Sequence, residues 1–131
     1  MKNLEIYRNA LRLLAQPPEG EENDDYEERA PFLIASACNA IRNLDKLLRQ
    51  ATDGAPAGEF NSVWLDLTED FPLLEQFAPT VCLFVAAMLV IDENEALYER
   101  LFALYSDSIS LLQDSQAFKT HPIVDVYGEL I

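Results

Sequence analysis

The most informative part of this sequence is the stretch APTVCLFVAAMLVIDENEA, residues 78–96. From Val81 to Ile91 no side chain carries a charge or an amide group, and only the thiol of Cys82 is weakly polar. A membrane span needs about 20 apolar residues, whereas a run of about 10–14 is typical of a helix buried in protein. We therefore expect residues 80–91 to form a central apolar helix that the other helices of the chain surround.

The composition limits the domain count and the classes of partner. The chain has 131 residues, half of them hydrophobic, and a formal net charge of −14. This length predicts a single domain, residues 1–131, with a core of its own. Nucleic acid and anionic membranes carry the same sign of charge, so neither is expected as a partner. The charge allows a basic partner, a metal ion or no more than solubility. The partner we expect is a protein, either another one or a second copy of this chain.

The cysteines and the N-terminal segment favour a cytoplasmic location. Cys38 and Cys82 each lie in an apolar run, where a thiol behaves as a small hydrophobic group. Two such residues form no disulfide framework, which indicates a reducing compartment. The opening MKNLEIYRNALRLL has polar residues throughout and lacks the apolar core of a secretory signal.

Apolar residues recur at helical spacing through most of the chain, and this pattern predicts an all-α fold. The expected helical segments, about five in a compact bundle, are residues 3–15, 31–51, a broken segment 61–71, 80–91, and 92 or 95 to 113. An acidic loop, about 17–29, should join the first two because dense like charge stays hydrated. Residues 118–131 fit either a short helix or a strand.

The last long helix should begin at a capping box and bury a wide face. Asp92 and Glu95 stand three residues apart, as the two members of such a box do. Two adjacent apolar seams follow, and their width favours burial of a broad face over a narrow coiled-coil stripe. The first seam is Leu97, Leu101, Leu104 and Leu111, and the second is Tyr98, Phe102, Tyr105, Ile109 and Leu112.

Nucleophilic catalysis is poorly supported. The one histidine, His121, lies near the C-terminal end, and Cys38 and Cys82 lie in apolar helices that disfavour a thiolate. Zinc ligands are not clustered, and the chain has neither an EF-hand loop nor a glycine-rich phosphate loop. We therefore expect no catalytic residues, no cofactor and no metal, and a protein that is not an enzyme.

One chemical alternative remains, a magnesium site made of helix carboxylates. Acidic helical pyrophosphohydrolases hold metal and substrate phosphates in this way. Acids in the first turn of a helix also complement its dipole without a metal, and the chain lacks an EE-x-x-E run on a helix. The residues that would supply this site are Asp92, Glu95 and Glu99 on one face, and Asp66, Glu69 and Asp70 in an adjacent segment.

The acidic loop has two interpretations. It is either a solvated surface loop or a docking strip for a basic protein, with Tyr26 as an aromatic anchor. The second interpretation makes the protein an acidic inhibitor or chaperone of a basic partner.

Two stretches together resemble a known family. They are YEERAPFLIASACNAIRNLDKLLR, residues 26–49, and FPLLEQFAPTVCLFVAAMLVIDENEALYERLFALYSDSI, residues 71–109. Their order of elements is similar to small helical proteins of phage and prophage neck and head–tail connector modules. The resemblance implies a non-enzymatic subunit that assembles in rings or docks on a portal, located in the bacterial cytoplasm or in the virion. It implies no catalytic residues.

Overall fold

The computed structural model describes residues 1–15 and 24–120, and over these residues the fold is all-α. No strand occurs in the described part, apart from one isolated bridge between Lys2 and Asp70. The α-helices are α1 (Asn3–Leu13), α2 (Asp24–Ala51), α3 (Ala78–Val90) and α4 (Glu95–Thr120), with a 3-10 turn at Glu75–Phe77 before α3. The described residues thus hold four α-helices where about five were expected.

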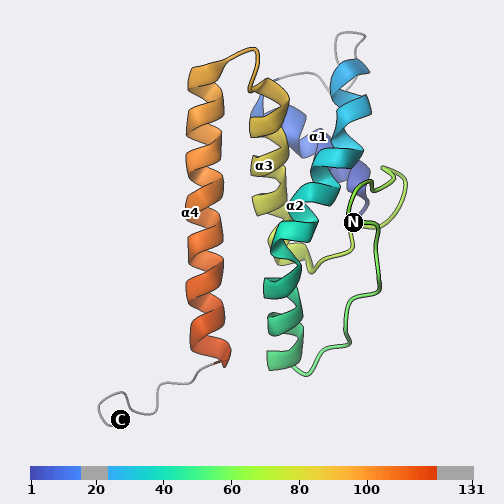
Figure 1. Ribbon diagram of the computed structural model, residues 1–131, viewed down its shortest axis with the longest axis vertical. Coiled ribbons are helices and arrows are strands. Elements are labelled where there is room, and N and C mark those ends of the chain that lie inside the picture. Colours follow the sequence, from blue (N-terminus) through green and yellow to red (C-terminus); the bar gives the residue numbers. More distant parts are fainter. Residues whose placement is uncertain (16–23, 121–131) are drawn as a thin grey trace.

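The apolar helix predicted at residues 80–91 is α3, which begins at Ala78 and ends at Val90. It packs against α1, α2 and α4 (Figure 1). Val85 and Leu89 on α3 are fully buried, and so is Ile34 on α2. Three α3 side chains, Leu83, Phe84 and Met88, stay partly exposed, so other elements do not enclose the helix on every side.

The N-terminal end of α1 is fixed to the segment that precedes α3. The Asn3 N–H donates to the Glu69 carbonyl and the Leu4 N–H donates to the Leu67 carbonyl, each at 2.9 Å. Lys2 also forms an ion pair with Asp70 at 2.9 Å. These bonds satisfy N–H groups that the first turn of a helix leaves without a partner.

Helix α2 begins at Asp24, earlier than the predicted start at Pro31, so the expected acidic loop at 17–29 is wrong for residues 24–29. Tyr26 and Ala30 are buried at helical spacing, and their burial extends the helix across the acidic stretch. The acids lie in the first turns, where negative charge complements the helix dipole. Residues 16–23 lie outside the described residues.

The buried position of Tyr26 corrects its expected role as an exposed anchor. Its side chain is 5% exposed, and its hydroxyl donates a hydrogen bond to a Glu93 carboxylate oxygen in the turn after α3. Tyr26 therefore joins the start of α2 to the α3–α4 turn.

The predicted helix at residues 61–71 is absent, and this segment forms turns and extended chain. Asn61 does not cap a helix. Its side-chain oxygen accepts the Val63 N–H at 2.8 Å and the Trp64 N–H at 3.2 Å, which closes a local turn. The Leu65 N–H then donates to the Pro31 carbonyl at 3.1 Å and attaches the segment to α2.

Helix α4 starts at Glu95, and its capping residue is Asn94 where the sequence predicts Asp92. The Asn94 side-chain oxygen accepts the Leu97 N–H at 3.0 Å, and the Asn94 carbonyl accepts the Tyr98 N–H at 2.9 Å. The helix runs to Thr120, past its predicted end at residue 113.

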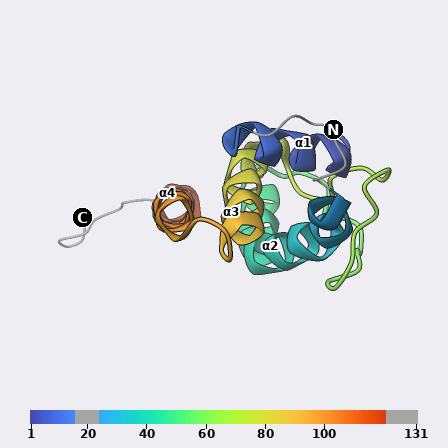
Figure 2. The same ribbon diagram turned by 90° about the horizontal axis from the view of Figure 1, so that it is seen from above.

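Helix α4 lies beside α3 on the outside of the group formed by α1, α2 and α3 (Figure 2). In the first predicted seam only Leu101 is buried, while Leu104 and Leu111 are exposed. The second seam, Tyr98 to Leu112, is partly buried, and the ring centroids of Tyr105 and Phe84 lie 5.2 Å apart. The wide buried face predicted for this helix is therefore shifted toward the second seam. The predicted C-terminal segment, 118–131, lies outside the described residues beyond Thr120.

Candidate protein-interaction surfaces

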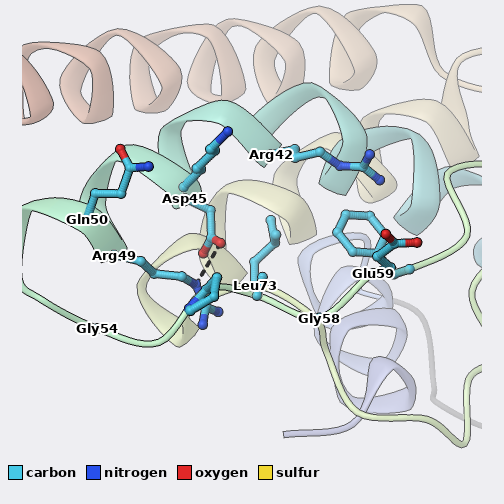
Figure 3. A pocket seen from close by; sticks show the side chains of 12 residues that line it. Arg42, Asp45, Arg49, Gln50, Gly54, Gly58, Glu59 and Leu73 are labelled. Atoms are coloured by element: carbon cyan, nitrogen blue, oxygen red, sulfur yellow. Dashed lines mark hydrogen bonds and ion pairs between the residues drawn. The ribbon is translucent and has the colours of Figure 1, made fainter.

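A hollow of about 620 Å³ lies between the C-terminal half of α2 and the loop that follows it (Figure 3). We call it the basic hollow, because three of the nine Lys and Arg residues in the chain line it, against the two acids Asp45 and Glu59. Those residues are Arg42, Lys46 and Arg49, and the apolar part of its lining includes Pro56, Ala57, Phe60 and Leu73.

Arg49 stabilises the walls of the basic hollow. Its Nε donates to the buried carboxylate of Asp45 at 2.8 Å, and its other nitrogens reach the Ala55 carbonyl at 3.2 Å and the Pro72 carbonyl at 3.5 Å. The second Asp45 oxygen accepts the Leu74 N–H at 2.9 Å. The pair therefore holds the loop and the segment before α3 against α2.

The other two cations of the basic hollow have no acidic partner among the described residues. The guanidinium carbon of Arg42 lies 4.3 Å from the centroid of the Phe60 ring, a cation–π distance. Lys46 is exposed and forms no ion pair with a described residue. Their positive charge is therefore available to an anionic group from outside, in a chain whose net charge is −14.

A second hollow, of about 440 Å³, lies between the N-terminal part of α2 and the same loop. We call it the acidic hollow. It is lined by Glu27, Glu28, Pro31, Trp64, Asp66 and Leu67. The Trp64 side chain remains 42% exposed there. An aromatic ring among carboxylates is suited to bind a cationic side chain, because both attract positive charge.

One flank of α4 forms a third surface. Leu104 is 53% exposed and Leu111 is 70% exposed. They are seven residues apart, so they lie on the same side of the helix two turns from each other. This flank, Leu104 and Leu111, is the α4 strip.

The carboxylates considered for a magnesium site do not form one cluster among the described residues, where no group of three His, Cys, Asp or Glu side chains could hold a metal. Asp92 lies in the α3–α4 turn and Glu95 and Glu99 lie at the start of α4, all exposed.

In the other group, the carboxylate of Asp66 accepts the N–H and the hydroxyl of Thr68, and these bonds lower the pKa of Asp66. The ion pair with Lys2 lowers the pKa of Asp70. Glu69 is exposed, and its carbonyl is used at the N-terminal end of α1. The carboxylates of Asp66 and Asp70 therefore serve local structure.

Both cysteines are buried and free. Burial raises the pKa of Cys38 to about 12, with a further contribution from the Asp45 charge, and burial raises the pKa of Cys82 to about 11. The Cys82 thiol lies 3.6 Å from the Ile6 carbonyl and can donate to it. Thiols in this state are protonated and unreactive near neutral pH. His121 lies outside the described residues.

The cations of the basic hollow have a pattern in the sequence. Arg42, Lys46 and Arg49 recur at spacings of four and three, which places them on one side of a helix. The acidic hollow has no such pattern in the sequence. Its residues come from α2 and from a distant loop, and only the fold brings Trp64 and Asp66 next to α2.

The chain matches no protein family, no curated protein and no solved structure with which it was compared. None of the helices in the described part of the chain has the length and the apolar character that crossing a membrane requires.

Proposed function

We propose that this chain is a non-enzymatic assembly protein that binds copies of itself through α4. The observation that carries the proposal is the α4 strip, two exposed leucines on the outermost helix of the bundle. A role like that of phage or prophage head–tail connector subunits, which the sequence resemblance implies, is the setting we propose for this assembly.

The energetics of leucine burial support this function. Removing one leucine side chain from water contributes about 1.5–3 kcal/mol, so Leu104 and Leu111 leave a stabilising contribution unused in the single chain. Their arrangement on one side of a long helix fits a helix–helix contact, in which residues seven apart meet the same partner. Contiguous exposed apolar surface often marks sites of protein association, and the proposal makes Leu104 and Leu111 part of such a surface.

The α4 strip can be tested with a double variant, Leu104→Gln with Leu111→Gln. Glutamine is a good helix former, so α4 should stay intact while the apolar contact is lost. The matched control is Ala96→Gln with Ala103→Gln, which places the same residue at two exposed positions of the same helix. Light scattering after size exclusion should show that the leucine variant assembles less than the wild type and the control assembles equally. Equal assembly of both variants would contradict the proposal.

A second candidate function is an acidic inhibitor or chaperone of a basic protein. The acidic hollow supports it, because Trp64 and three carboxylates there suit a cationic side chain. The two functions differ in their complexes. An inhibitor forms a one-to-one, salt-sensitive complex with its partner, whereas an assembly protein associates with itself.

A further inference from the structure

The basic hollow and the acidic hollow lie on one face of the molecule. Glu28 and Lys46 are 18 residues apart on α2, which is five turns at about 3.6 residues per turn, so they point to the same side. Their separation along the helix is roughly 27 Å. The loop after α2 supplies the other wall of both hollows. This face, α2 with the loop of residues 54–67, is the α2–loop face.

The α2–loop face carries opposite charges at its two ends. Glu27 and Glu28 lie at the N-terminal end, and Arg42 and Lys46 lie toward the C-terminal end. If a second copy meets this face with its own α2 antiparallel, each acidic hollow lies opposite a basic hollow. A two-fold contact has this property, since residue i of one copy meets residue j of the other, and j meets i.

Beside the acidic hollow, the loop exposes two apolar side chains. Val63 is 64% exposed and Trp64 is 42% exposed, and both follow Phe60 of the basic hollow by a few residues. Interfaces between proteins have an apolar centre, in which tryptophan is enriched, and a charged rim. Val63 and Trp64 supply exposed apolar surface to the α2–loop face, beside its acidic end.

We propose that two copies of this chain associate through the α2–loop face about a two-fold axis. Arg42 and Lys46 of each copy meet Glu27 and Glu28 of the other, and Val63 and Trp64 beside each acidic hollow add apolar contact. This contact deepens the proposed function. It rests on the proposal that copies of the chain assemble. A two-fold contact alone stops at a dimer, and the α4 strip then links dimers into a larger assembly.

The contact can be isolated in the background Leu104→Gln with Leu111→Gln, which removes the α4 strip. In that background sedimentation velocity should give the mass of a dimer. A monomer in this background would overturn the α2–loop contact, even where the wild type assembles through α4. Unchanged assembly in this background would instead count against the α4 strip, so the two failures are distinguishable.

Charge reversal in the same background tests the pairing itself. Glu28→Lys and Lys46→Glu should each raise the dissociation constant of the dimer at least about tenfold, because like charges then face each other. An equal mixture of the two variants should form a heterodimer, and the double reversal should restore the homodimer. The controls Glu5→Lys and Arg8→Glu change the net charge equally at exposed positions of α1 and should leave the dimer intact. Equal weakening by the controls, or no restoration in the mixture and in the double reversal, would overturn the proposal.

Discussion

Asp45 and Arg49 form an ion pair one turn apart on α2, at 2.8 Å, with 2% of the Asp45 side chain and 17% of the Arg49 side chain exposed. The same carboxylate accepts the Leu74 N–H from the segment before α3. The Asp45 carboxylate thus binds both Arg49 on its own helix and the backbone of the segment before α3.

Asp45→Ala should therefore lower the free energy of unfolding by about 3 kcal/mol. Removing one member of a buried pair leaves the other charge without compensation, and the Leu74 N–H also loses its acceptor. Asn43→Ala, two residues away on the same helix and exposed, is the control and should change stability by less than about 0.5 kcal/mol. Urea unfolding measures both, and equal effects would show that the pair does not stabilise the fold.

Truncating a leucine of the core and a leucine of the α4 strip should change the free energy of unfolding by different amounts. Leu89→Ala should cost about 2–5 kcal/mol, because Leu89 is 1% exposed and its truncation opens a cavity in α3. Leu104→Ala should change the stability of the single chain by less than about 0.5 kcal/mol, since Leu104 faces solvent. Thermal unfolding at low protein concentration compares them. A loss below about 0.5 kcal/mol for Leu89→Ala would place α3 outside the core.

At the start of α4, we expect the loss of Asn94 to destabilise the fold more than the loss of Asp92. Asn94→Ala should cost about 1 kcal/mol, because Asn94 caps the helix through the Leu97 N–H. Asp92→Ala should have a smaller effect, since no described hydrogen bond uses the Asp92 side chain. Denaturant unfolding of the two variants decides between them, and the reverse order would restore Asp92 as the cap.

Stability should fall at high pH partly through Tyr26. Burial, the hydrogen bond to Glu93 and the Glu93 charge raise the pKa of Tyr26 to about 12. A tyrosine in the unfolded chain has a pKa of about 10, so between these values the unfolded state loses its proton first. The stabilisation is complete below pH ~10 and is lost as the pH rises toward about 12.

Urea unfolding across this pH window should show a shallower loss of stability in Tyr26→Phe than in the wild type. The buried cysteines contribute a loss of the same sign to both proteins, so the comparison isolates Tyr26. Tyr98→Phe is the control, because it removes a hydroxyl from α4 and leaves the contact with Glu93 intact. A slope in Tyr26→Phe as steep as that of the wild type would contradict the assignment.

The sequence identified the helices whose apolar residues keep a helical period, because burial and period agree there. Residues 3–13 are the example, whereas residues 78–90 are apolar on every face and were predicted from the length of the apolar run. The start of α2 was not predicted, because the dense negative charge of this stretch indicated a loop. The helical spacing of Tyr26, Ala30 and Ile34 indicated a helix, and acids are favourable at the start of a helix. The segment 61–71 was missed because Val63, Trp64 and Leu67 have helical spacing, while tertiary bonds to Pro31 and Asn3 hold the chain extended.

The interaction surfaces depended more on tertiary structure than the helices did. The exposure of Leu104 and Leu111 follows from the position of α4, which leaves one edge of a wide apolar face outside the bundle. Helical period alone could not choose which edge faces outward. The spacing of the basic residues on α2 was visible in the sequence, but their pairing with the loop required the fold.

Sedimentation velocity of the unmodified chain over a wide concentration range tests the central claim, self-assembly, most directly. The account predicts that the average mass rises with concentration from the 14.8 kDa of one chain to values above that of a dimer. A single species with the mass of one chain at every concentration would contradict it.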